Sequence, residues 1–137
     1  MSDQQPVRVS DIMSTRYQTV DGMMTVAEAI DKLKANNAIA LIVDKRHDND
    51  EYGIVLISDI ARRVLAADRA PDRVNIYEIM SKPVVTVDPD MDIRYCARMF
   101  DKFGLSRAPV VDNKTLVGII SYTDMVLQGM CKQLNIE

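Results

Sequence analysis

The hydrophobic and polar positions along the chain predict the same order of elements twice. A helix opened by Thr25 precedes two continuous apolar runs, 39–43 and 52–57, which are typical of buried strands. The second half repeats this order with a helix opened by Asp92 and a hairpin over 108–120. Each half is therefore predicted to form strand, helix, strand, strand, helix.

Local signals fix where both long helices begin. Thr25 and Glu28 have capping-box spacing, and the helix they open is expected to end near 35–37. Asp92 is an equivalent start for the second helix. The apolar positions expected to face the core are Val26, Ala29, Ile30 and Leu33 in the first helix, and Ile93, Ala97, Phe100 and Phe103 in the second.

Short motifs recur at matching places in the two halves. D-I-M at 11–13 corresponds to E-I-M at 78–80, and G-I-V-L-I-S-D at 53–59 corresponds to G-I-I-S-Y-T-D at 118–124. The offset, about 67 residues at the front and about 65 later, indicates a duplication. The predicted organisation is a flexible N-terminus (1–8), a first motif (9–68), a linker (69–75) and a second motif (76–134), with 9–134 as one structural module.

A half of about 65 residues buries little core alone, so we expect the two halves to pack together. Their short apolar strands should form small sheets flanked by helices, which is an α+β fold.

Composition excludes several classes of function. A net charge of −3 and a pI near 5.1 provide no basic surface for nucleic acid. No apolar run approaches the roughly 20 residues that span a bilayer, and the N-terminus lacks the apolar core of a signal peptide. We therefore expect a cytoplasmic protein with no membrane and no nucleic acid as partner. Cys96 and Cys131 are expected to be free thiols, and the single histidine, His47, makes a metal site improbable.

The stretch around Ser121 carries the candidate chemistry. Ser121 is expected where a strand ends and a helix begins, with Asp124 three residues later. A hydroxyl, a carboxylate and unpaired backbone N–H groups at a helix N-terminus suit an anion. The same spacing is also close to a capping box, which only stabilises its own helix. The local pattern leaves both alternatives open.

The ordered, duplicated motifs resemble a tandem pair of CBS domains, also called a Bateman module. The resemblance covers about residues 9–130 and includes S-R-A-P-V-V-D at 106–112 and A-L-I-V-D at 40–44. It implies two motifs packed with pseudo-two-fold symmetry. It also implies a regulatory sensor that binds AMP, ADP, ATP or S-adenosylmethionine, has no catalysis of its own and requires no cofactor.

The family's signature, Gly, apolar, x, Ser or Thr, x, x, Asp, is complete in the second motif. By resemblance, Ser121 would bind a phosphate, Asp124 the ribose hydroxyls, and 107–109 together with 86–87 the base. A ribose diol offers two donors, and a carboxylate only accepts, so these roles are chemically matched. The implied ligand-binding residues are Thr86, Val87, Arg107, Ala108, Pro109, Gly118, Ser121, Thr123 and Asp124. The cations considered for an anionic ligand are Arg16, Arg62, Arg63, Arg94 and Arg107.

The first motif departs from the signature. Leu56 stands where Ser or Thr is expected, and Ala40 is taken to stand where the second motif has Pro109. Asp59 is retained, with a role in either ribose binding or helix capping. The residues of this weaker second site are Thr19, Ile39, Ala40, Ser58 and Asp59.

The alternative hypothesis is a structural or dimerisation module without a ligand. The last helix carries more apolar residues than a small core needs, which would suit a homodimer interface. These residues are Met125, Val126, Leu127, Met130 and Leu134. An enzyme is not expected, because the chain offers no Ser–His–Asp or Cys–His pair. Since no catalytic, channel or DNA-binding domain is joined to the motifs, the regulated protein is expected to be a separate chain.

Overall fold

The computed structural model describes residues 6–82 and 84–137. The chain divides into two compact units. The first unit spans 16–84, and the second combines the segment up to Thr15 with the chain from Val85 onward. The units therefore differ from the sequence repeats, because the short segment that opens each repeat belongs to the unit formed by the rest of the other repeat.

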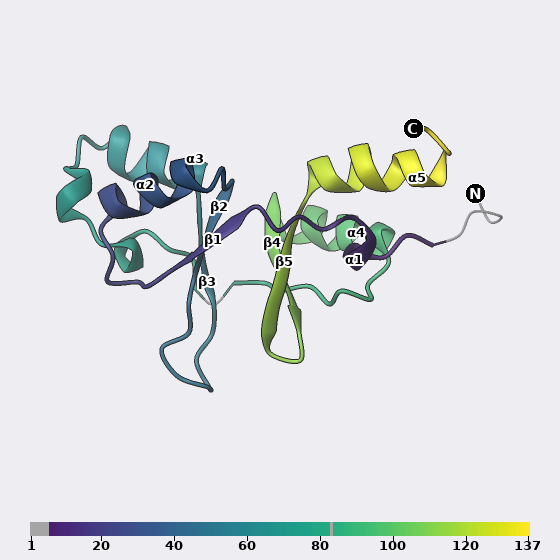
Figure 1. Ribbon diagram of the computed structural model, residues 1–137, viewed down its shortest axis with the longest axis horizontal. Coiled ribbons are helices and arrows are strands. Elements are labelled where there is room, and N and C mark those ends of the chain that lie inside the picture. The colour runs from purple at the N-terminus through teal and green to yellow at the C-terminus, as the bar shows by residue number, and fades with distance from the viewer. Residues whose placement is uncertain (1–5, 83) are drawn as a thin grey trace. The chain divides into compact units, whose positions relative to one another are not determined.

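The first unit is built on a three-stranded sheet in the order β1-β2-β3 (Figure 1). β1 (Tyr17–Val20) and β2 (Ala40–Val43) are parallel, and β3 (Gly53–Leu56) pairs antiparallel with β2. Parallel neighbours need a crossover, and α2 (Val26–Ala35) provides it. All four residues of the central strand β2 are buried.

The start of α2 confirms the predicted capping box. The Thr25 hydroxyl accepts a hydrogen bond from the Glu28 N–H at 3.2 Å, and the helix ends at Ala35. Val26, Ala29 and Leu33 are buried as expected. The prediction for Ile30 was wrong, since its side chain lies at the edge of the apolar stripe and remains 40% exposed.

The first unit continues with a helix and two short turns. α3 (Ile57–Ile60) leads directly into the π-helix η1 (Ala61–Leu65), and the 3-10 turns η2 (Pro71–Arg73) and η3 (Ile76–Glu78) follow. The sequence predicts the helix but not its widening into π geometry.

The second unit contains a hairpin and helices. β4 (Arg107–Asp112) and β5 (Thr115–Ser121) are antiparallel, and Val87 forms a parallel bridge to Val110 as a reduced counterpart of β1. The remaining elements are α1 (Val9–Ile12), α4 (Ile93–Phe103), the π-helix η4 (Asp124–Met130) and α5 (Cys131–Gln133).

The hairpin turn follows from its sequence. Asn113 and Lys114 have φ values of 49° and 67°, as a two-residue turn between right-twisted strands requires. At α4 the Asp92 carboxylate accepts from the Arg94 N–H, which confirms the predicted start. Phe103 was predicted to be buried but is 56% exposed, because it belongs to the last turn of the helix, just before the left-handed residue Gly104.

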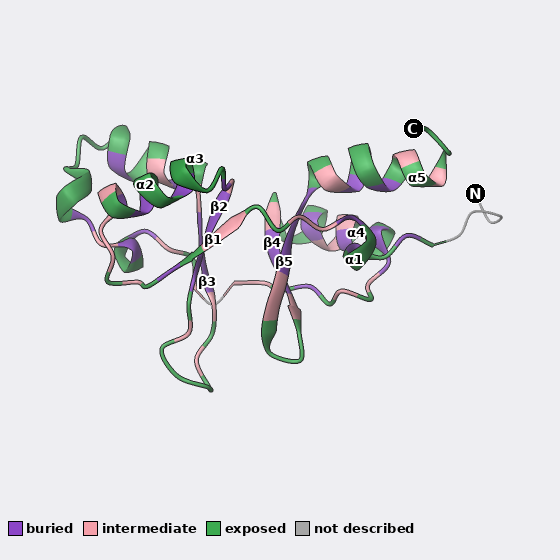
Figure 2. Ribbon diagram, viewed as in Figure 1, coloured by how far each residue is buried: buried purple, intermediate pink, exposed green. Residues whose placement is uncertain are grey.

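Each unit has its own apolar core (Figure 2). The largest side chains buried in the first core include Leu41, Ile76 and Ile79, and those in the second include Phe100 and Ile120. Small sheets covered by helices confirm the predicted α+β class. Of the helices within the described ranges, none has the length and apolar character to cross a bilayer.

The N-terminal segment closes the second unit. The Ser14 N–H donates to the Ile119 carbonyl and the Ile119 N–H to the Ser14 carbonyl, both at 2.8 Å. The Met13 side chain lies over Gly118, where a Cβ would be 2.6 Å from the sulfur of Met13. Glycine is thus needed at 118 because this segment crosses the strand.

The first unit is closed in the same way by the segment that follows η3. Ile54 and Ser81 exchange two backbone hydrogen bonds of 3.0 Å. The Met80 side chain lies over Gly53, where a Cβ would be 2.9 Å from the sulfur of Met80. The two D-I-M-like motifs therefore perform one structural task, each in the unit of the other repeat.

Part of the predicted flexible N-terminus, 1–8, lies outside the described residues. In the described part of this segment, Val7 is buried and its carbonyl accepts a hydrogen bond from the Ile93 N–H at 3.0 Å. The backbone of Arg8 forms an isolated antiparallel β-bridge with that of Asp92.

Replacing Gly118 with alanine is expected to destabilise the second unit by about 1–3 kcal/mol, because the added methyl group would overlap Met13 and the Ser14 carbonyl. Urea unfolding would measure the change. Gly22→Ala is the control, since a Cβ there meets only ordinary contacts of 3.4 and 3.5 Å. Equal stability of the two variants would contradict the packing argument.

Candidate functional site

The candidate site is the junction between β5 and the helix that follows it. Ser121 ends β5 and is 4% exposed, helical backbone begins at Tyr122, and Asp124 is the third residue of the turn. Oδ2 of Asp124 accepts from the Ser121 N–H at 3.0 Å and from its hydroxyl at 2.9 Å. The Asp124 N–H donates back to the Ser121 hydroxyl at 3.2 Å. The capping-box alternative is therefore present in the structure.

Capping uses only half of the Asp124 carboxylate. Among the described residues, no protein group donates to the second oxygen, Oδ1. Asp124 is half-buried, so this oxygen belongs to a carboxylate that is only partly hydrated. An ionised carboxylate only accepts hydrogen bonds, and Oδ1 is therefore suited to hydroxyl or N–H groups of a ligand.

Arg107 lies beside this junction. It is the register partner of Ser121 across β4 and β5, and paired residues of neighbouring strands direct their side chains to the same face. Arg107 is half-buried, and within 6–82 and 84–137 its guanidinium has no hydrogen-bond partner. A cation and a carboxylate oxygen thus both remain available at one end of this hairpin.

The other cations considered for the site have partners elsewhere. Each of the other four hydrogen-bonds a group of its own unit: Arg16 contacts Asn37, Arg62 contacts Asp59, Arg63 contacts the Ile79 carbonyl, and Arg94 contacts Asp92.

The remaining predicted ligand-binding residues fall into two groups, one buried and one exposed. Ala108 and Pro109 are buried in β4, and the Pro109 carbonyl accepts from the Val87 N–H at 3.0 Å. The structure therefore brings Val87 next to Pro109. Thr86, adjacent to Val87, is exposed, as is Thr123 in the first helical turn after Ser121.

Gly118 has a structural role, which its surroundings explain. It is buried opposite Val110, with Met13 above it. The glycine of the signature is thus explained by the crossing segment, independently of any ligand.

The first unit has the same junction with different chemistry. Asp59 Oδ2 accepts from the Leu56 N–H at 2.8 Å, and Oδ1 accepts from Nη2 of Arg62 at 2.9 Å. Both oxygens of this carboxylate therefore have donors, and Leu56 supplies no hydroxyl. Ser58 is exposed.

The strand register corrects one comparison between the repeats. Ala40 pairs with Leu56 as Arg107 pairs with Ser121, so Ala40 is equivalent to Arg107 and Ile42 to Pro109. Equating Ala40 with Pro109 was wrong, because Pro109 pairs with Ile119 and the corresponding pair in the first unit is Ile42 with Ile54. The first junction thus has no arginine at this place. Ile39 is half-buried just before β2, and Thr19 is exposed in β1.

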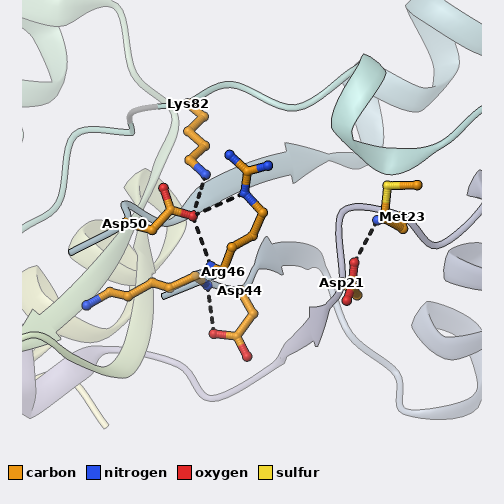
Figure 3. A network of polar contacts seen from close by, with 7 residues as sticks. Asp21, Met23, Asp44, Arg46, Asp50 and Lys82 are labelled. Carbon is orange, nitrogen blue, oxygen red and sulfur yellow. Dashed lines mark hydrogen bonds and ion pairs between the residues drawn. The ribbon is translucent and has the colours of Figure 1, made fainter. Parts of the chain in front are cut away.

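A polar network that the sequence does not reveal lies elsewhere in the first unit (Figure 3). Asp50 accepts from Nζ of Lys82 at 2.8 Å, from the Arg46 N–H at 2.9 Å, and lies 3.7 Å from the Arg46 guanidinium. The Lys82 ammonium, together with the backbone N–H groups of Arg46 and Glu51, holds the pKa of Asp50 well below its usual range. This network fastens the long loop after β2 to the segment that follows η3.

Cys96 and Cys131 are free, and burial raises the pKa of Cys96 to about 11, which keeps it protonated and inert. In the portion of the chain that the structure describes, no three His, Cys, Asp or Glu side chains are grouped to hold a metal.

A family model described as "CBS domain" matches the chain twice, over residues 9–66 and 76–128. The protein YhcV of Bacillus subtilis, named as CBS domain-containing, is 29% identical over 125 residues, which are 91% of this chain and 87% of that protein. An uncharacterized protein of Methanopyrus kandleri is 29% identical over 121 residues, and the chain spans only 61% of its length.

Solved structures show the same fold. The hexameric CBS-CP12 protein from bloom-forming cyanobacteria is 39% identical, with a TM-score of 0.87 over 91% of this chain and 72% of that chain. The CBS domain pair of protein MJ0100, in complex with 5′-methylthioadenosine and S-adenosyl-L-methionine, is 29% identical, with a TM-score of 0.78 over 93% and 99%. These likenesses confirm the resemblance inferred from the duplicated motifs.

Replacing Lys82 with glutamine is expected to lower the melting temperature at neutral pH, because Asp50 loses its strongest partner. A carboxyl whose pKa is depressed by folding stabilises the protein above its ordinary pKa, 3.8, and this contribution disappears as the pH falls through the lower folded value. The difference from wild type should therefore be full above about pH 5 and shrink in stronger acid. Thermal unfolding monitored by circular dichroism would measure it, with Lys102→Gln on α4 as the control. A difference that does not depend on pH would contradict this assignment.

Proposed function

Because the chain belongs to the CBS-domain family, we propose that it is a regulatory module that binds an adenosine-containing ligand in its second unit. The ligand class is AMP, ADP, ATP or S-adenosylmethionine, and the module signals to a separate partner protein without a reaction of its own. One observation carries the proposal: Asp124 Oδ1 and the Arg107 guanidinium are both without a protein partner among the described residues, at the same end of one hairpin.

Each available group matches one part of such a ligand. Oδ1 of Asp124 accepts from the ribose hydroxyls, while Oδ2 continues to cap the helix. Arg107 pairs with phosphate oxygens, for which a planar guanidinium is well suited. Thr86 and Val87 contact the base together with Ala108 and Pro109, which offers a rigid wall without an N–H. Ser121 contributes mainly by holding Asp124 in place.

The nucleoside complex of the MJ0100 domain pair supports this class of ligand, since that pair has the same fold at 29% identity. Differential affinity for two states of the module is the only route by which a ligand could alter a partner. The free thiols are consistent with a reducing, cytoplasmic setting.

Self-association is a second function that a specific observation favours. Val126, Leu127 and Met130 on η4, and Leu134 just after α5, are 45–60% exposed, whereas Met125 is buried. The first unit also carries an apolar groove of about 750 Å³ between α2 and η1. Apolar surface of this extent suits a homodimer, and the cyanobacterial relative is described as hexameric.

Calorimetric titration with AMP, ATP and S-adenosylmethionine tests the ligand. Asp124→Ala is expected to weaken binding at least about tenfold for every ligand, because a hydrogen bond to a charged group is lost. Arg107→Ala should weaken AMP and ATP by a similar factor and leave S-adenosylmethionine, which has no phosphate, nearly unchanged. Asp101→Ala and Arg98→Ala, both at exposed positions of α4, are the controls. No heat with any of the three compounds, or full affinity in Asp124→Ala, would refute the proposed site.

Light scattering coupled to size exclusion tests the homodimer. The double change Met130→Glu and Leu134→Glu is expected to convert a dimer to a monomer, because it places charge in the apolar surface. Met23→Glu, at a residue 70% exposed in the first unit, should not change the mass. A monomeric wild type at high concentration would rule out this interface.

A further inference from the structure

We propose that Arg62 keeps the first unit's counterpart of the site closed, so that each chain binds one ligand and not two. This inference rests on the proposed ligand site in the second unit and concerns what distinguishes the two junctions. It assigns to Arg62 the role of the residue that determines which of the two junctions binds ligand.

The two capping carboxylates differ in one oxygen. Oδ2 of Asp59 and Oδ2 of Asp124 each accept the N–H of the residue three positions earlier. Oδ1 of Asp59 accepts from Nη2 of Arg62 at 2.9 Å, whereas Oδ1 of Asp124 has no donor within the described ranges. The difference arises three residues after each aspartate, where the first motif has Arg62 and the second has Leu127. Leucine has no donor, so it cannot occupy the carboxylate.

Arg62 is held along its own helix. Besides the bond to Asp59, its Nε donates to the Ser58 carbonyl at 3.4 Å. Pairs three and four residues apart on a helix are neighbours, so this arrangement needs no tertiary contact. The guanidinium is thus positioned as a lid on the carboxylate and not as a phosphate ligand.

Displacing Arg62 is unfavourable for a neutral diol. The Asp59 side chain is only 13% exposed, while that of Arg62 is 71% exposed. A ribose would exchange a charge-assisted hydrogen bond for neutral ones at a carboxylate that is largely removed from water. Leu56 has no hydroxyl to hold Asp59 as Ser121 holds Asp124, and Ala40, which replaces Arg107 in the register, offers the ligand no cation. The occupied oxygen and the two missing groups all oppose binding at this junction.

The test is the stoichiometry of AMP and S-adenosylmethionine binding, measured by calorimetry and by equilibrium dialysis at saturation. Wild type is expected to bind one ligand per chain, and Arg62→Leu, which copies the second motif, is expected to bind two. Adding Leu56→Ser should tighten the new event about tenfold, because a hydroxyl at this position would hold Asp59 as the Ser121 hydroxyl holds Asp124. Arg63→Leu is the matched control, since Arg63 contacts the Ile79 carbonyl instead of Asp59. Asp59→Ala in the Arg62→Leu background should remove the second event, and thermal unfolding would verify that every variant is folded.

The outcomes separate this inference from the proposed function. One site in wild type, lost in Asp124→Ala, with still only one site in Arg62→Leu, would overturn the role of Arg62 and leave the second-unit site standing. No binding in wild type but one site in Arg62→Leu that depends on Asp59 would support the lid while refuting the second-unit site. Two sites in wild type, or no binding in either protein, would overturn the inference.

Discussion

In each unit a methionine side chain lies against a glycine of a sheet strand, Met13 over Gly118 and Met80 over Gly53. Backbone pairing between the crossing segment and the neighbouring strand residue fixes this contact. Because the strand runs directly into a helix, the crossing segment also determines where Ser121 and Leu56 lie. The geometry of the candidate site therefore depends on a methionine packed against the strand that leads to it. This contact includes none of the polar groups that are proposed to bind a ligand.

The carboxylate that follows each strand has a structural task before it has a functional one. Asp124 and Asp59 each accept a hydrogen bond from a backbone N–H at a helix start. An unpaired donor at this place would reduce the stability of the fold. A carboxylate has two oxygens, so capping leaves one for other partners. Duplication has produced two copies of this arrangement, and a single helical position three residues later decides whether the remaining oxygen meets a guanidinium or stays accessible.

The sequence predicts what local chemistry controls and misses what tertiary contacts decide. Thr25, Asp92 and the Asn113–Lys114 turn act within a few residues, and their elements were confirmed. The exposure of Phe103 depends on packing that periodicity does not describe. At the candidate site, the capping by Ser121 and Asp124 was foreseen as an alternative, and Arg62 is close enough to Asp59 that helical spacing could have revealed their pairing. The Asp50–Lys82 pair spans 32 residues and has no such signal.

The first unit is one uninterrupted stretch, 16–84, placed inside the sequence of the second. An excised fragment that followed the repeat, 9–68, would leave the N–H of Ile54 without the Ser81 carbonyl and Gly53 without the covering side chain of Met80. A fragment cut at 16 and 84 keeps both the Ile54–Ser81 backbone pairing and the contact of Met80 with Gly53. The boundaries of the two structural units are therefore offset from those of the sequence repeats. An ancestral protein with a single motif would accordingly have needed a second copy of itself to supply the covering segment.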